Sequence, residues 1–292
     1  METAARTVRC REIRTTDLAE VLVLLQKGFP ERSRDQLRRA LDRQSAHAPP
    51  LGFPKYGYLL ESNGNAVGVI SVIFSSMTVD GELRVRGNVA NWYVEPEFRS
   101  YAAMLTSRAL GHKNVTFLNI TPAAHTWPIL EAQGYRRFST GLFFAVAWLS
   151  PGSSRARIRN ASAGVPAGEE LSPSETDLLR DHASYGCLSL VCDSSTGRHP
   201  FVFAIRWTRW KSLPLPYALL VYCRDLTDFV RFSGPLGRFL ALRGMPLVCI
   251  DSTGPIPGLI GKFVEWGPKF FKGPNRPTLG DLSYTEGVVF NP

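Results

Sequence analysis

The apolar positions in the first half of the chain switch between helical and strand-like spacing. Leu18, Val21 and Leu25 recur at the spacing of one helical face, whereas β-branched and aromatic residues form short runs typical of strands. Asn63-Gly64 separates two such runs and is a strong hairpin signal. In chain order, the pattern predicts strands over 8–14, 56–61, 67–74, 88–94, 115–120, 135–138 and 142–149, and helices over 17–27, 33–41, 100–110 and 124–133.

Capping boxes mark several of the predicted helix starts. Such a box places Ser, Thr or Asp three residues before Glu or Gln. The pairs are Asp17 with Glu20, Ser33 with Gln36, and Ser172 with Glu175, the last followed by Pro173 at the first helical position.

The second half begins with a change of composition. Residues 150–170 are rich in Gly, Ser, Pro, Ala and Arg without periodicity, which predicts a linker. The pattern then predicts a helix over 172–184, strands over 187–193, 201–207 and 217–223, a helix opened by Gly234-Pro235, a strand over 246–251, and a tail of turns and short extended pieces from Gly254. This order repeats the central part of the first half, so a second lobe of the same fold is a hypothesis that rests on element order alone.

Residues 88–110 predict a strand, a short turn and a helix. Pro96 stops the strand because proline cannot donate to a ladder, and the turn carries Arg99. The free amides and dipole of a helix start can bind an anion. The alternative is a structural corner without a ligand.

Composition limits the partners. The net charge of +9 is evenly spread, with 18 Lys/Arg against 13 Asp/Glu in residues 1–150 and 16 against 12 in the remainder. This lacks the dense basic run of a nucleic-acid-binding arm, so we expect no nucleic-acid partner, while an anionic ligand and an acidic partner fit equally well. Five cysteines without C-x-x-C spacing favour buried, reduced thiols and no metal site.

The hydropathy profile predicts the cellular location of the protein. No apolar run reaches the roughly 18 residues of a membrane-spanning helix, and no apolar signal-peptide region follows the N-terminus. We therefore expect a soluble, cytoplasmic protein without a transmembrane segment, either a monomer or a homo-oligomer.

The element order, together with two short motifs, resembles the GNAT superfamily of acyl-CoA-dependent N-acyltransferases over about residues 8–149. The motifs are Val94-Glu95-Pro96-Glu97-Phe98-Arg99 before a helix and Glu131-Ala132-Gln133-Gly134-Tyr135 at a helix end. The resemblance implies an α+β fold, with a GNAT-like mixed sheet flanked by helices and a second, smaller α/β lobe that could share the fold. It divides the chain into a GNAT-like domain (1–149), a linker (150–170) and a second lobe with its tail (171–292).

The resemblance also implies where the co-substrate binds. In that family, the pantetheine arm of acyl-CoA pairs with the strand before the turn, and the pyrophosphate lies on amides at the following helix start. The matching positions are Val94, whose amide would be the oxyanion donor, and Arg99, Ser100, Tyr101, Ala102 and Ala103. The family usually has glycines at the positions of Ser100, Ala102 and Met104, and this chain has none of them.

Catalysis in the family is attack of an amine on the thioester, which needs a base and often a tyrosine acid. Leu130 stands at the tyrosine position and Ala123 at an asparagine position, and the strand before the turn has Asn88 and Asn91 where a carboxylate base is often found, so three expected groups are missing. The candidate replacements are His125 as base, because histidine side chains titrate near neutral pH, with Asn91 and Asn119 as orienting groups. Alternatively, His125 is a solvated first-turn residue and Asn119 a polar strand end.

Two functions remain open at this point. One is an enzyme that moves an acyl group from acyl-CoA, or an acyl carrier, to a small-molecule or peptide amine. The other is a non-catalytic GNAT-fold module that binds acyl-CoA or a protein partner.

Overall fold

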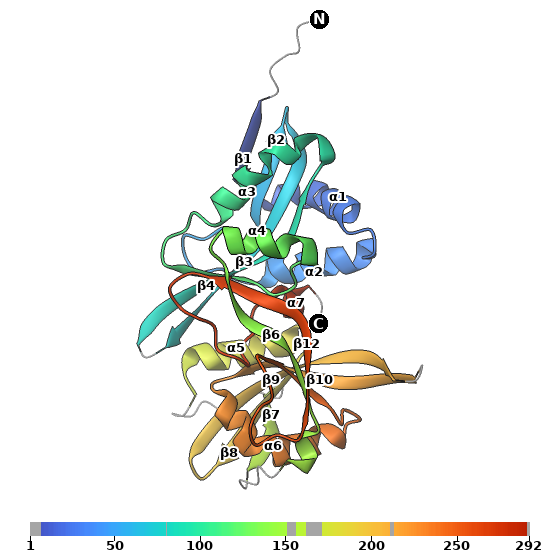
Figure 1. Ribbon diagram of the computed structural model, residues 1–292. Coiled ribbons are helices and arrows are strands. Elements are labelled where there is room, and N and C mark those ends of the chain that lie inside the picture. Colours follow the sequence, from blue (N-terminus) through green and yellow to red (C-terminus); the bar gives the residue numbers. More distant parts are fainter. Residues whose placement is uncertain (1–6, 80, 151–155, 162–170, 211–212, 291–292) are drawn as a thin grey trace, which may run out of the picture. The chain divides into compact units, whose positions relative to one another are not determined.

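A computed structural model of the chain describes residues 7–79, 81–150, 156–161, 171–210 and 213–290. These residues form a mixed α+β fold in two compact units (Figure 1). The first unit runs up to Ile120 and also includes Lys272–Asn275 and the segment from Tyr284, whereas the second holds Thr121–Phe271 and Arg276–Ser283. The sequence analysis placed domain boundaries at residues 149 and 171, and these boundaries stay a prediction.

The first unit contains a sheet in the order β1-β2-β3-β4-β5, antiparallel except for the parallel pair β4–β5. Its elements are β1 (Val8–Glu12), η1 (Thr15–Asp17), α1 (Leu18–Gly28), α2 (Arg34–Ala46), β2 (Gly57–Ser62), β3 (Asn65–Val79), β4 (Glu82–Val94), η2 (Pro96–Tyr101), α3 (Ala102–Ala109), β5 (Val115–Asn119) and α7 (Glu286–Val289).

Helices cover both faces of this sheet. Neighbouring residues of a strand point to opposite faces, so each strand contributes side chains to the packing on both sides. Val69 lies in the core with Leu24 and Leu25 of α1. Gly68, one residue earlier, faces Leu105 of α3. The predicted hairpin turn is confirmed, since Asn63 and Gly64 have φ of 49° and 83°.

The second unit contains the strand order β12-β6-β11-β10-β9-β8-β7, in which β10 and β11 are parallel. Its elements are η3 (Ala124–Thr126), α4 (Trp127–Ala132), β6 (Arg136–Ala145), η4 (Ala147–Leu149), β7 (Arg157–Asn160), α5 (Pro173–Ser184), β8 (Leu188–Ser194), β9 (Gly197–Trp210), β10 (Leu213–Cys223), α6 (Leu226–Ala241), β11 (Val248–Ser252) and β12 (Gly261–Lys272).

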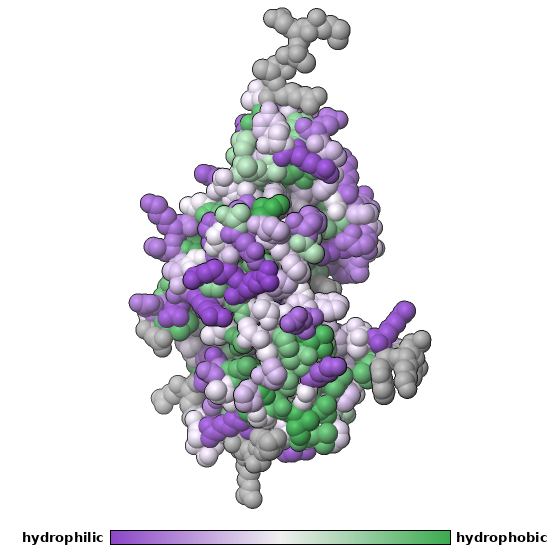
Figure 2. Space-filling model, viewed as in Figure 1, coloured by the Kyte–Doolittle hydropathy of each residue, from purple (hydrophilic) through white to green (hydrophobic). Residues whose placement is uncertain are grey.

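The core of the second unit lies between its sheet and α6. Phe201 and Phe203 of β9 pack with Phe229 and Phe232 of α6, and all four side chains are fully buried. Helix α5 lies on the opposite face, where Ser189 donates to Leu179 O. On the face shown in Figure 2, hydrophobic residues gather most densely on this unit.

Two of the three predicted capping boxes are confirmed. Ser33 and Ser172 each accept from the backbone N–H three residues on, and the Gln36 and Glu175 side chains accept in return from the cap N–H. The box at Asp17 is wrong, because its carboxylate accepts from Arg14 N–H and from Arg11 instead.

Three other predicted elements are wrong. The two strands expected in 135–149 are one continuous strand, β6, which both β11 and β12 border along residues 141–145. Helix α6 starts at Leu226 rather than at Gly234-Pro235, and it contains Pro235. The tail, expected to be turns and short extended pieces on the second lobe, contains the twelve-residue strand β12, and part of it belongs to the first unit.

The predicted linker lies mostly outside the described residues. Within it, Arg157–Asn160 form β7, which pairs with β8. The four-residue strand was too short to give a detectable pattern.

Candidate functional site

Strand β4 runs beyond the end of its pairing with β5. The two strands pair from Val85–Val115 to Asn88–Leu118, and β5 ends at Asn119 while β4 continues to Val94. Within the described part of the first unit, the C-terminal part of β4 therefore presents an edge that β5 does not cover. This is the strand that the sequence analysis assigned to the pantetheine arm.

A β-bulge reshapes this edge. Two residues, Asn91 and Trp92, face the single residue Ile70 of β3, because Tyr93 pairs with Val69 and Ala90 with Ser71. Asn91 has φ of 44°, a left-handed conformation that asparagine tolerates. Its buried side chain accepts a hydrogen bond from Arg32 (3.1 Å), which holds the bulge in place.

The bulge also decides where the Val94 amide points. Glu95 N–H donates to Val67 O (2.9 Å), so Val94 and Gly68 form a non-hydrogen-bonded antiparallel pair. The Val94 N–H therefore points away from β3, toward the uncovered edge. A donor in this direction can bind a carbonyl oxygen.

Side chains at the start of α3 form an accessible surface beside this edge. Arg99, Ser100, Tyr101 and Ala103 are exposed, and Ala102 is half-buried. The α-helix begins two residues later than expected, at Ala102, after the 3₁₀ turn η2. In that turn amides bond internally, as Ala102 N–H does to Arg99 O. Anion binding here would depend on side chains and the helix dipole more than on free amides.

Asn88 and the C-terminal helix α7 close the space between β4 and β5 at the point where the pairing of these two strands ends. Asn88 is 2% exposed; its amide donates to Leu118 O (3.3 Å), and its side-chain oxygen accepts from Glu286 N–H. Asn88 is thus fixed in the structure rather than available to substrate. No local sequence pattern could predict this contact, because 198 residues separate its two partners.

The predicted catalytic residues do not all lie in one unit. Asn91 and Asn119 lie in the first unit, the latter half-buried at the end of β5. His125 is exposed in η3 and belongs to the second unit, as does Leu130, which is buried in α4. Trp92 is exposed and Tyr93 packs against the core of the first unit.

The second unit contains a comparable parallel pair, β10 and β11, but another segment of the chain lies beside β10 where this pairing ends. Strands β10 and β11 pair in parallel only at Ala218–Val248 and Leu219–Cys249, and β10 has a bulge at Val221. Past this point the tail takes the place of β11. Cys223 N–H donates to Gly280 O (2.9 Å), and Leu282 N–H donates to Val221 O (2.7 Å).

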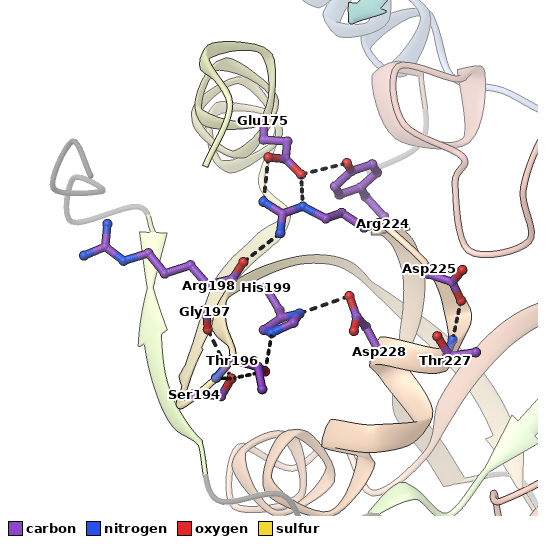
Figure 3. Close-up of polar contacts among 11 residues, drawn as sticks. Glu175, Ser194, Thr196, Gly197, Arg198, His199, Arg224, Asp225, Thr227 and Asp228 are labelled. Atoms are coloured by element: carbon purple, nitrogen blue, oxygen red, sulfur yellow. Dashed lines mark hydrogen bonds and ion pairs between the residues drawn. The ribbon is translucent and has the colours of Figure 1, made fainter. Parts of the chain in front are cut away.

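The helix start that follows β10 is acidic (Figure 3). Asp225 caps α6 by accepting from Thr227 N–H (2.7 Å), and Asp228 lies 3.0 Å from His199 Nδ1. Two carboxylates at this helix start oppose the binding of a phosphate. Of the two strand–turn–helix corners, the one in the first unit is therefore the candidate site.

An ion pair joins α5 to the end of β10 (Figure 3). Arg224 donates two hydrogen bonds to Glu175, whose side chain is 8% exposed. Burial alone would raise the pKa of the Glu175 carboxyl, but the bonds from Arg224 and from Ser172 N–H outweigh it and lower that pKa. The charged form is thus favoured in the folded protein.

This pair predicts a pH-dependent stability. A lowered pKa contributes stability above the unfolded-state value, near the ordinary 4.5, and loses it as the pH falls through the folded-state value. Glu175→Gln should therefore lower the free energy of unfolding by about 1–2 kcal/mol at neutral pH, with the difference vanishing in acid. Urea unfolding at several pH values measures this. The control is Asp177→Asn, which breaks an exposed pair with Arg180 on the same helix; an equal, pH-independent loss in both variants would contradict the prediction.

Among the described residues, the side chains that commonly bind metal ions do not cluster. No group of three or more His, Cys, Asp or Glu side chains among them could hold a metal ion. All five cysteines are free; four of them are buried and Cys10 is half-buried. None of the described helices is long and apolar enough to cross a membrane.

Comparison with known proteins identifies the fold. No protein-family model and no curated protein matches the sequence. Among solved structures, a GCN5-related N-acetyltransferase from Anabaena variabilis is similar with a TM-score of 0.58 and 10% identity, over 91% of this chain and 72% of that one. A putative acetyltransferase from Pyrococcus horikoshii gives 0.54 and 10%, over 95% and 93%. Eis1 from Mycobacterium abscessus gives 0.50 and 14%, over 94% and 74%.

These similarities extend over both halves of the chain. At such low identity they show the fold alone. The resemblance inferred from residues 8–149 is thereby confirmed as a likeness of fold, and it covers nearly the whole chain rather than half of it.

Proposed function

Because the chain has the fold of the GCN5-related N-acetyltransferases, we propose that it transfers an acyl group from acyl-CoA to an amine. The donor site would lie at the uncovered edge of β4 in the first unit. The observation that carries this proposal is the Val94 N–H, which the bulge directs toward that edge. The tail fills the comparable edge of the second unit, so we expect one donor site in each chain.

Donor binding would use backbone and side chains together. The amides of the pantetheine arm would pair with the edge of β4, as an added strand does. The pyrophosphate would lie at the start of α3, where Arg99 offers a charge-assisted contact and Ser100 and Tyr101 offer hydroxyl groups. Ala102 and Ala103 are small enough to let it approach.

The proposed reaction is direct transfer. The amine nitrogen attacks the thioester carbonyl carbon, the Val94 N–H stabilises the developing oxyanion, and the CoA thiolate leaves. The amine must lose a proton, and His125 is our candidate base. Asn91 and Asn119 would orient the acceptor or the pantetheine, since asparagine side chains do not titrate. The free cysteines are in keeping with a reducing, cytoplasmic setting.

The alternative function is a non-catalytic module that binds acyl-CoA or a partner. It is favoured by Leu130, which is buried in α4 and cannot protonate a leaving thiolate, and by Ala123. Both functions require the donor edge, so donor binding and transfer must be measured separately.

Binding of acyl-CoA is the first test. Titration calorimetry and thermal shift against acetyl-, medium-chain and long-chain acyl-CoA should show binding to one site per chain, since a ligand of the native state raises the melting temperature. Arg99→Ala should weaken binding by about 1.5–3 kcal/mol, or about 10- to 150-fold, through loss of a charged hydrogen bond.

The matched control is Arg39→Ala, which removes another exposed arginine, from α2 of the same unit. It should leave affinity unchanged. No heat and no shift with any acyl-CoA would contradict the donor site. Binding without transfer to any amine in a broad panel would favour the module.

A further inference from the structure

We propose that one end of the second unit is a docking surface for membranes that carry anionic lipids. A line of paired residues marks this end of its sheet, running across five strands: Gly261 pairs with Ala145, Ala145 with Val248, Val248 with Ala218, and Ala218 with Ile205. The chain segments at and beyond this line all lie at the same end of the unit. We call this region the apolar end.

Large hydrophobic side chains are exposed at the apolar end. Trp207 is 67% and Leu242 86% exposed. The full set consists of Trp148, Leu149, Ile205, Trp207, Leu242 and Ile260. Exposed apolar groups concentrated in one region mark an interaction site more often than scattered ones do.

Direct contacts join three of the segments that carry these residues. Val146 N–H donates to Ile260 O (2.8 Å), and Ile260 N–H donates to Ser150 Oγ (3.0 Å). The Cα of Gly237 in α6 lies against the backbone of Trp148, so closely that a Cβ there would be 2.2 Å from Trp148 N. The last turn of α6, which ends before Leu242, therefore lies beside the same surface.

The charge at the apolar end is of one sign. The segments 145–150, 205–218, 238–248 and 253–261 contain no Asp or Glu. Among their described residues, the exposed basic side chains are Arg209, Arg238 and Arg243. Basic residues around exposed Trp, Leu and Ile fit an interfacial site, where apolar groups enter the headgroup boundary and cations meet anionic headgroups.

The first unit provides an internal comparison. Its β3–β4 hairpin occupies the place in the strand order that β9–β10 occupies in the second unit, yet Glu82, Arg84 and Arg86 give its second strand both signs of charge. Leu83 is its exposed large apolar residue. The aromatic and basic character of β9 is thus not a requirement of the hairpin itself.

A lipid surface fits these residues better than a nucleic acid does. Leu149, Leu242 and Ile260 are aliphatic and offer no ring for a base to stack on, whereas all three can enter a bilayer interface. Binding would be peripheral, and salt would weaken it because the basic residues are exposed.

Vesicle co-sedimentation of the full chain tests the proposal. Vesicles of phosphatidylcholine with phosphatidylglycerol should bind the protein at least about tenfold more tightly than phosphatidylcholine alone, since each basic residue near an anionic surface contributes about 1 kcal/mol. High salt should remove the difference. Leu149→Glu with Leu242→Glu should lower vesicle binding about tenfold or more, and Arg209→Glu with Arg243→Glu should abolish the preference for phosphatidylglycerol.

Leu83→Glu is the matched control: this leucine of the first unit is 68% exposed, between Leu149 (50%) and Leu242 (86%), and the variant should bind like the wild type. All substituted side chains are exposed, so melting temperatures should stay near that of the wild type. Absence of vesicle binding at low salt, or equal loss in the Leu83 variant, would overturn the proposal. So would binding of a single-stranded oligonucleotide that depends on the same residues while vesicles do not bind.

Discussion

Lys269→Ala should lower the free energy of unfolding by about 3–5 kcal/mol, because it leaves a buried carboxylate without its counter-charge. Lys269 Nζ lies 2.7 Å from Asp251 Oδ1, and the two side chains are only 12% and 2% exposed. Apart from this ion pair, neither Asp251 oxygen has a hydrogen-bond partner among the described residues. Urea unfolding of the variant and the wild type at neutral pH measures the loss.

A double substitution separates the cost of an unpaired charge from the value of the pair. Replacing both partners by apolar residues of similar size is often neutral or stabilising. Asp251→Leu with Lys269→Met should therefore be at least about 2 kcal/mol more stable than Lys269→Ala alone. A loss below about 1 kcal/mol in Lys269→Ala would show that water or another group reaches Asp251 in solution.

His125→Ala should lower kcat by about 10²- to 10⁴-fold if the chain is an enzyme that uses this base. The amine must lose a proton, and the polar residues on β4 near the donor edge, Asn88 and Asn91, do not titrate. Acyl-CoA affinity should be nearly unchanged, so that the loss appears in kcat rather than in donor binding.

The control for His125 is Thr126→Val on the same 3₁₀ turn. It removes the hydroxyl that donates to Ala123 O (2.7 Å), and it tests whether a local disturbance of η3 is enough to lower the rate. Only His125→Ala should produce the large loss. Full activity without His125 would assign the deprotonation to water or to another group.

Local chemistry in the sequence determined much of the first unit. The Asn63-Gly64 turn and the Ser33 capping box each depend on residues a few positions apart, so the sequence predicted them correctly. The same holds for the strand ended by Pro96 and the turn and helix behind it. The fold class followed from the order of such elements.

The tertiary structure decided what long-range pairing controls. Pro235 lies inside α6, although proline usually ends a helix, because one face of that helix, from Phe229 to Leu240, is buried against its sheet and η4. Strand β6 is continuous because β11 and β12 border it. Neither fact has a local sequence signal.

The candidate site shows the same division. The sequence by itself determined a strand, a proline turn with Arg99 and a helix start, which are local features. Only the tertiary structure decided that the bulge at Asn91 turns the Val94 N–H to an uncovered edge, and that the tail fills the comparable edge of β10. The physical reason is that a backbone donor is free or paired according to which strand lies beside it, and that neighbour can be any segment of the chain.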